Sequence, residues 1–233
     1  MNVIHPTENW FVLDSGPGAP AENMAWDEAI LEAAGALGGP VLRFYSWTEP
    51  AASFGYFQRI ADVEAWTPLR PLVRRPTGGG LVPHDADWTY SLTFPPAHGW
   101  FQLRAAESYR RLHEWVRDAF ARAGLPTELA ARGAKELPGR CFAGPEKSDL
   151  LWRGAKIAGA AQRRTKHGLL IQGSIQPPPL GMARADWQRA MREVATEKFA
   201  VVWNDWKPLP TVVAAAAQLA RSKYSQDAHN RRR

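Results

Sequence analysis

The 233-residue chain has one cysteine, which excludes an intramolecular disulfide and a cysteine-based metal cluster within one chain. It also lacks an apolar run of the roughly 20 residues that a membrane-spanning helix needs. Its first residues show no basic stretch followed by an apolar stretch and a cleavage site, so a cytoplasmic location is expected. With 45% hydrophobic and 22% charged residues, the composition is that of a globular protein rather than a disordered or fibrous one.

Much of the net charge of +6 lies at the C-terminus. Residues 221–233 carry five basic side chains and one acidic one, a charge of +4, so the rest of the chain is only mildly basic. A short basic end of this kind is typical of a solvated, disordered tail. We therefore expect one folded domain over residues 1–220 and a disordered basic tail over 221–233, with no nucleic-acid or membrane partner.

Hydrophobic periodicity predicts helices interspersed with short strands. Apolar residues recur at helical spacing over residues 23–37, with Asn23 as the N-cap, over 106–125 and over 187–194. An Ala-rich helix is expected near the C-terminus. Segments rich in β-branched and aromatic residues, bounded by Gly and Pro, predict strands at 40–47, 52–57, 71–76, 88–95, 148–154, 156–164 and 168–177. This order predicts an α+β fold with a mixed, largely antiparallel sheet and packed helices.

The most informative segment is RRPTGGGLVPHD at residues 74–85. Three adjacent glycines among strands are unfavourable unless the backbone adopts an unusual conformation or lies directly against a ligand. Successive N–H groups of such a loop can face a carbonyl or phosphate oxygen, and the two arginines add positive charge. The histidine either pairs with Asp85 to hold the turn or accepts a proton. The expected substrate-binding residues of this segment are Arg74, Arg75, Thr77, Gly78, Gly79, Gly80 and His84.

This segment resembles the signature loop of the biotin/lipoate protein ligase superfamily, in particular its lipoate-ligase and octanoyltransferase branch. Three other segments are similar to that family in the expected order. ENMAWDEAIL at 22–31 resembles its first helix, residues 40–58 its following strands, and residues 149–175 the lysine-bearing part of its acyl site. The resemblance spans most of residues 8–200. It implies a catalytic domain similar to those of class II aminoacyl-tRNA synthetases and biotin ligases.

The resemblance also implies two catalytic residues. Lys156 matches the lysine that holds the acyl carbonyl or carboxyl oxygen, an interaction worth roughly 3 to 4 kcal/mol in a dry site. The neighbouring Gly159 and Ala160 are expected to contact the substrate. Cys141, in the segment CFAGP, matches the thioester-forming cysteine of stand-alone octanoyltransferases. A thiol becomes a good nucleophile near cations, and Arg140 and Lys156 are the expected sources of that positive charge.

Two reaction routes are implied for such a domain. Transferases pass the acyl group from a thioester through an enzyme cysteine without a cofactor, whereas ligases use ATP and Mg²⁺ to form an acyl-adenylate. The presence of Cys141, and the short stretch after Val202 where long lipoate ligases carry an accessory domain, favour transfer. The expected function is octanoyl or lipoyl transfer to the lysine of a lipoyl-carrier protein, either GcvH-like or a dehydrogenase E2 domain. Acyl carrier protein is the expected donor, and no metal ion takes part.

Two alternatives remain open at this point. The first is an ATP-dependent lipoate-protein ligase in which Arg74, Lys156 and the glycine loop bind the nucleotide. It gains weight because Gln172 stands where many relatives have a histidine, and a glutamine cannot shuttle a proton. The second is a non-catalytic module that binds lipoyl domains. On any of these interpretations the acyl chain needs an apolar tunnel, whose expected walls are Trp47, Phe54, Tyr56, Leu81 and Leu92.

Overall fold

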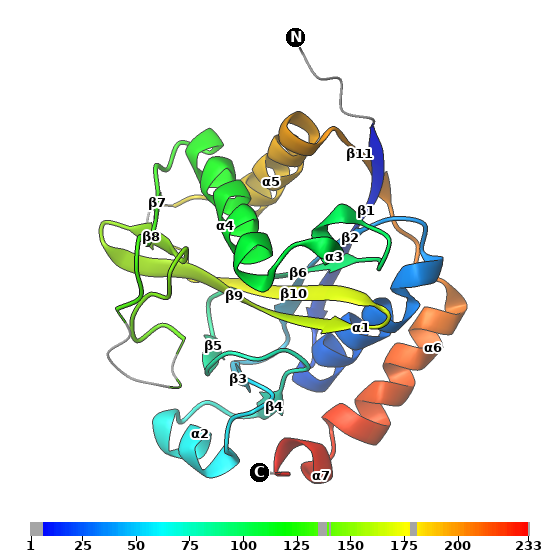
Figure 1. The fold of residues 1–233 in the computed structure, drawn as a ribbon. Helices are drawn as coiled ribbons and strands as arrows, with labels where there is room; N and C mark the ends of the chain where they lie inside the picture. The colour runs from blue at the N-terminus through cyan, green and yellow to red at the C-terminus, as the bar shows by residue number, and fades with distance from the viewer. Residues whose placement is uncertain (1–6, 135–138, 140, 178–180, 233) are drawn as a thin grey trace.

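A central eight-stranded sheet organises the computed structural model, which describes residues 7–134, 139, 141–177 and 181–232 (Figure 1). Strand β1 pairs in parallel with β2 and β11, and the other neighbouring strands are antiparallel. This confirms the α+β class and the mixed, largely antiparallel sheet. The spatial order is β11 (Val201–Asp205), β1 (Glu8–Gly18), β2 (Val41–Trp47), β6 (Trp88–Phe94), β10 (Gly168–Ile175), β9 (Ala155–Thr165), β8 (Leu150–Trp152) and β7 (Glu128–Leu129).

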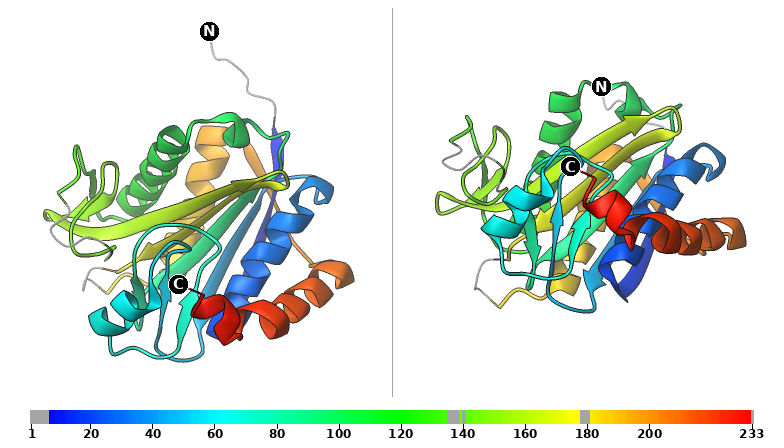
Figure 2. Two further views of the ribbon diagram at one scale, coloured as in Figure 1. Left: turned by 60° about the horizontal axis from the view of Figure 1, so that its bottom comes forward. Right: turned by 90° about the horizontal axis from the view of Figure 1, so that it is seen from below.

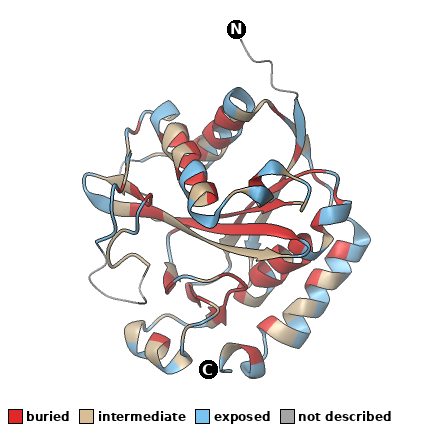
Figure 3. Ribbon diagram, in the orientation of Figure 1, coloured by how far each residue is buried: buried red, intermediate tan, exposed pale blue. Residues whose placement is uncertain are grey.

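Helices cover both faces of this sheet (Figures 1 and 2). On one face lie α4 (Ala105–Arg122) and α5 (Arg184–Phe199), which pack on each other, together with the short α3 (Gly99–Gln102). On the other face lies α1 (Pro20–Ala33), which ends in a 3₁₀ turn at Ala34–Ala36, and α6 (Pro210–Leu219) packs against α1. The two central strands β6 and β10 are therefore buried along their whole length, as Figure 3 shows for β10.

A second, three-stranded sheet lies beside α1 (Figure 2). It consists of β4 (Leu72–Arg74), β3 (Ala51–Phe54) and β5 (Val82–His84), in that order, and α2 (Ile60–Trp66) connects β3 to β4. The glycine loop is the connection from β4 to β5, and it lies against β9 of the large sheet. An added Cβ on Gly79 would lie 3.4 Å from the Ala161 methyl group, and the Arg163 guanidinium donates to the Pro76 carbonyl.

The C-terminal residues are folded, so the expected disordered tail over 221–233 is wrong for residues 221–232. They form a π-helical turn (Ala220–Tyr224) and the helix α7 (Asp227–Asn230). Tyr224 is buried and donates to the Glu28 carboxylate, which also pairs with Lys223. The Arg74 guanidinium donates to the carbonyl of His229. The basic residues are thus ordered because a buried aromatic ring, a carboxylate and backbone carbonyls hold the segment against the body.

The first helix begins earlier than predicted. It starts at Pro20, a favourable first helical residue, and the Glu22 carboxylate accepts a bond from the Ala19 N–H. Asn23 is therefore not the N-cap; its amide donates to the carbonyls of Gly18 and Ser46 and ties the helix to β2. Across the described ranges, no helix combines the length and apolar character that crossing a bilayer demands.

Candidate active site

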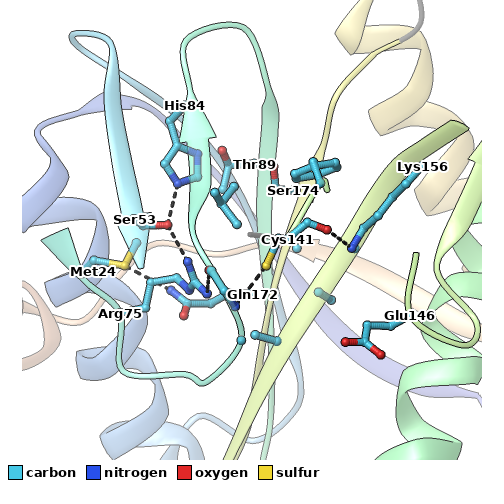
Figure 4. Close-up of a pocket in the computed structure, with 18 of the residues that line it drawn as sticks. Met24, Ser53, Arg75, His84, Thr89, Cys141, Glu146, Lys156, Gln172 and Ser174 are labelled. Carbon is cyan, nitrogen blue, oxygen red and sulfur yellow. Dashed lines mark hydrogen bonds between the residues drawn. The ribbon is translucent and has the colours of Figure 1, made fainter. Parts of the chain in front are cut away.

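A cavity that opens to solvent lies between the small sheet with its glycine loop and strands β9 and β10, with about 660 Å³ of empty space when the solvent at its mouth is included (Figure 4). Eight of the eleven predicted site residues line it: Arg75, Gly79, Gly80, His84, Cys141, Lys156, Gly159 and Ala160. Much of the remaining wall is apolar. Of the five residues expected to form an acyl tunnel, Trp47 lines the cavity, whereas Phe54, Leu81 and Leu92 pack in the core and Tyr56 stacks with Arg232.

Three of the predicted substrate-binding residues do not line the cavity. The Arg74 guanidinium is buried and donates to the carbonyls of Tyr56 and Gln58 as well as to the C-terminal segment. Thr77 is buried and donates to the side chain of Gln172. Gly78 accepts, through its carbonyl, a bond from Arg75. These residues hold the glycine loop in place, and their predicted contact with substrate stays a prediction.

Cys141 lies in a loop that is hydrogen-bonded directly to the glycine loop. Its N–H donates to the Leu81 carbonyl at 3.0 Å, and the Leu81 N–H donates to the Gly139 carbonyl at 2.7 Å. The Gly80 N–H donates to the Cys141 sulfur at 3.1 Å, and the cysteine is partly exposed. A Cβ on Gly80 would lie 2.5 Å from the Gly139 oxygen, so only glycine permits this approach of the two loops.

Arg75 is a cation close to the sulfur of Cys141, since a Cβ added to Gly79 would lie 3.3 Å from one of its Nη atoms and 3.8 Å from that sulfur. Burial lowers the pKa of Arg75, and its interactions with Cys141 oppose that shift. One guanidinium nitrogen donates to Ser53 at 2.9 Å, and the other donates to the carbonyls of Gly78 and Gly80, each at 2.8 Å. The sequence assigned this positive charge to Arg140 and Lys156. Arg140 lies outside the described residues, and Lys156 is placed differently.

Lys156 bonds to the backbone of the cysteine rather than to its sulfur. The ammonium donates to the Cys141 carbonyl at 2.6 Å and forms an ion pair with Asp149 at 2.7 Å. Both side chains are buried, with 5% and 0% of their surface exposed, so the carboxylate compensates a charge that would otherwise be strongly unfavourable. Gly159 leaves room for the ammonium, because a Cβ there would lie 2.9 Å from Nζ.

Asp149 is a site residue that the sequence analysis missed. Besides Lys156, it accepts bonds from the Glu146 N–H at 2.6 Å and from the Tyr109 hydroxyl on α4. Burial and the Asp149 carboxylate raise the pKa of Tyr109 well above its ordinary value, so the phenol stays neutral and donates. Nothing in the motif marked Asp149, because it stood at the start of a predicted strand. The carboxylate is the group that orients Lys156.

His84 pairs with Asp87, so the expected pairing with Asp85 is wrong. The ring nitrogen Nδ1 lies 2.8 Å from the Asp87 carboxylate, and Nε2 lies 2.7 Å from the hydroxyl of Ser53. The Trp47 indole stacks on the imidazole with 3.9 Å between the ring centroids. Asp85 is exposed, because the chain turns outward directly after β5. Both ring nitrogens of His84 therefore have partners.

Gln172 is fixed in a buried polar network beneath the cavity. Its amide nitrogen donates to Asp27 at 2.7 Å, and its amide oxygen accepts from Thr77 at 2.7 Å. Asp27 also forms a buried ion pair with Arg43 at 2.8 Å and accepts a bond from Ser91. The amide thus supplies a donor and an acceptor in fixed directions and links α1, β10 and the glycine loop. Because an amide does not titrate, this group cannot act as a general acid or base.

The arrangement brings a thiol, two cations and a backbone N–H to one side of a largely apolar cavity, and groups of these kinds can serve acyl chemistry. Within the described part of the chain, no group of three or more His, Cys, Asp or Glu side chains is placed to hold a metal ion.

This fold is that of the lipoate-protein ligases. A bi-partite lipoate protein ligase from Thermoplasma acidophilum, whose structure was studied with its E2 lipoyl domain, superposes with a TM-score of 0.74 at 20% identity. The match covers 97% of each chain. A lipoate-protein ligase A bound with ATP gives a TM-score of 0.78 at 21% identity and covers 97% of this chain and 99% of the ligase. At this level of identity the likeness establishes the fold alone.

Sequence comparison identifies the family. Residues 19–176 match the lipoyl protein ligase A/B catalytic domain, and the chain belongs to that family. The octanoyltransferase LipM of Anoxybacillus flavithermus is 37% identical over 182 residues, or 72% of this chain and 65% of the relative. LipM of Bacillus subtilis is 37% identical over 181 residues, with the same shares. This chain therefore spans about 65% of the length of these relatives.

Proposed function

We propose that this protein transfers an octanoyl group from an acyl thioester to the lysine of a lipoyl-carrier domain, through a thioester formed on Cys141. The observation that carries the proposal is the position of the Cys141 sulfur at the wall of the cavity, bonded to the Gly80 N–H. The relatives named octanoyltransferase support the choice of acyl group. An acyl carrier protein is the proposed donor, and a GcvH-like protein or an E2 lipoyl domain is the proposed acceptor.

In the first half-reaction the Cys141 thiolate attacks the carbonyl carbon of the donor thioester. The carbonyl electrons move to its oxygen, the bond from that carbon to the donor sulfur then breaks, and the departing thiolate takes a proton from solvent. Lys156 uses two of its three ammonium hydrogens on Asp149 and the Cys141 carbonyl. We assign the third to the substrate oxygen, where a preorganised donor stabilises the developing negative charge.

In the second half-reaction the amine of the acceptor lysine attacks the thioester. The amine must first lose a proton, since its pKa in water is about 10.4. The carbon–sulfur bond to Cys141 breaks as the amide forms, and the Gly80 N–H donates to the returning thiolate. His84 is the proposed final acceptor of the amine proton. Because the Ser53 hydroxyl occupies its Nε2, the proton would reach the imidazole through that hydroxyl.

The acyl chain is assigned to the apolar part of the cavity. Met24, Trp47, Val82, Ala160 and Ala161 contribute to this wall. Their side chains offer a dry surface to a saturated chain. The proposed route requires no cofactor. Activation by ATP belongs to the ligase alternative.

The test is intact-mass analysis after incubation with an octanoyl-loaded carrier protein. We expect the mass of one octanoyl group on the protein, its removal by hydroxylamine, and its absence from the Cys141→Ser variant. Lys156→Met should slow the appearance of the adduct by about 100-fold or more, whereas the exposed Lys147→Met serves as a control with an ordinary rate.

Other outcomes of the same experiment would replace the proposal. If Cys141→Ser still attached free lipoate to a lipoyl domain in the presence of ATP and Mg²⁺, and no adduct formed from the thioester, the protein would be a ligase. If neither route gave product although the lipoyl domain bound, it would be a non-catalytic binding module.

A further inference from the structure

We propose that Arg75 is the catalytic cation that stabilises the Cys141 thiolate, and that Ser53, His84 and Asp87 are positioning residues that hold Arg75 against the sulfur. The inference rests on the proposed role of Cys141 as nucleophile and adds the groups that make it reactive. The sequence analysis expected Arg75 and His84 to bind substrate, and it did not name Ser53 or Asp87.

The first argument is the position of the guanidinium. A Cβ added to Gly79 would lie 3.3 Å from an Nη atom of Arg75 and 3.8 Å from the Cys141 sulfur, so both groups surround one glycine. Gly79 has φ +84°, a conformation that glycine adopts without strain. Lys156, by contrast, is directed to the carbonyl of the same cysteine. Arg75 is thus the cation placed to interact with the sulfur itself.

The second argument is the charge balance around Arg75. The residue is 5% exposed, and an isolated buried charge is strongly unfavourable. Among the described residues no carboxylate forms an ion pair with it, and the groups that favour its charged form are Cys141 and, more weakly, Tyr45. The pKa of Tyr45 is raised well above its ordinary value by burial, so this phenol stays neutral. Among the described residues, Cys141 is therefore the side chain that most favours the charged form of Arg75.

The third argument is the series of hydrogen bonds that ends on Arg75. The Asp87 carboxylate accepts hydrogen bonds from Thr89 and Ser174, and as an acceptor it also receives the bond that the His84 Nδ1–H donates. Nε2 is then an acceptor, and the Ser53 hydroxyl donates to it. The free lone pairs of that hydroxyl face Arg75, which donates to them at 2.9 Å. Every donor has one acceptor, which fixes the orientation of the guanidinium.

Among the residues that the structure describes, the other titratable groups around the sulfur do not duplicate this role. Lys156 on β9 is paired with Asp149. Tyr109 on α4 lies close enough for Cys141 to contribute to its raised pKa, and it stays neutral. Glu146, in the loop that follows the cysteine, lines the cavity and is exposed. The removal of Arg75 therefore takes away the positive charge that is directed at the sulfur.

Alkylation by iodoacetamide tests the inference. The chain has no second cysteine, so the reaction reports on Cys141 alone, and the reagent is uncharged, so its rate follows the thiolate population. For Arg75→Gln we expect a rate at neutral pH about tenfold below that of the wild type, and a pH profile displaced to higher pH. Ser53→Ala should displace the pH profile in the same direction. His84→Gln keeps an acceptor for the Ser53 hydroxyl, so this variant should retain most of the wild-type alkylation rate.

The adjacent Arg74 provides the matched control. It is also buried, and its guanidinium donates to the carbonyls of Tyr56, Gln58 and His229, which do not line the cavity. Arg74→Gln should lower stability while the alkylation profile of the folded protein stays as in the wild type. A folded Arg75→Gln variant with the wild-type profile would overturn the role of Arg75. If Arg75→Gln proves unstable, Ser53→Ala decides, since an unchanged profile there removes the positioning role.

The two proposals can fail separately. If no octanoyl adduct forms on Cys141 but the alkylation profile depends on Arg75, the transfer function is wrong and the assignment of the cation stands. If the adduct forms and the pH profile of alkylation is the same in the wild type, Arg75→Gln and Ser53→Ala, the transfer function stands and this inference is wrong.

Discussion

The imidazole of His113 should make the stability of the protein depend on pH between about 6.5 and 4. This residue on α4 is fully buried against the Tyr109 ring, and Nδ1 donates to the Tyr109 carbonyl. Burial lowers its pKa from 6.5 to about 4. Between these values the unfolded chain binds a proton that the folded chain does not. The free energy of unfolding therefore falls as the pH is lowered through this window.

The magnitude follows from the two pKa values. Lowering the pH from 7 to 5 should remove about 2 kcal/mol of stability through this one residue, and complete protonation about 3 kcal/mol. The assay is urea denaturation followed by tryptophan fluorescence at pH 7 and pH 5. In His113→Gln, which cannot gain a charge, the difference in stability between the two pH values should shrink by about 2 kcal/mol.

His167, an exposed residue in the turn between β9 and β10, supplies the control. His167→Gln should leave the pH dependence of the wild type unaltered. Carboxylates also titrate in this range, so the quantity that matters is the difference between the wild type and each variant. Equal losses in the wild type and in His113→Gln would refute the argument, because they would show that the buried imidazole does not resist protonation.

Three further predictions concern the site and the C-terminal segment. Gly80→Ala should slow formation of the octanoyl adduct about 100-fold, because the new Cβ displaces the cysteine loop. Gly35→Ala, where the added Cβ meets open space, should form the adduct at the wild-type rate. Mass spectrometry over time measures the rate for both variants. Asp149→Asn should lower the unfolding free energy by up to about 3 kcal/mol in urea denaturation, since the buried Lys156 loses its counter-charge. Tyr224→Ala should lower it by about 3 to 5 kcal/mol, measured in the same way, because a fully buried ring is lost.

The four longest helices, α1, α4, α5 and α6, and most strands could be predicted because their residues carry the pattern locally. Strand β1 (Glu8–Gly18) had no predicted counterpart. It contains Gly and Pro, and its partners are β2 and β11, the latter nearly the whole chain away. Its pairing is therefore decided by tertiary structure. The basic end was mistaken for a tail for a related reason, because its order depends on Glu28 and Arg74 in distant segments.

The sequence pointed to the glycine loop, Cys141 and Lys156 as parts of one site, and all three contribute to the wall of the cavity. It did not predict the directions of the side chains around them. Arg74 and Arg75 are adjacent in an extended segment and point to opposite sides, so only one can face the cavity. The motif gave no means of choosing between them. His84 pairs with Asp87, three residues further on, rather than with the next residue, because the chain turns directly after β5. Ser53 lies in a strand of small residues without a recognisable motif, so its role depends on contacts that only the fold reveals.

The cavity is lined by residues from distant parts of the chain, among them Met24, Ser53, Cys141 and Gln172. The helix α4 and the β9–β10 hairpin depend on neighbours close in sequence, whereas the site requires the closure of long loops, which is entropically unfavourable and slow. A newly made or refolding molecule should therefore acquire most of its helix and hairpin content before its cysteine becomes reactive. During that interval it would be compact, yet unable to accept an acyl group.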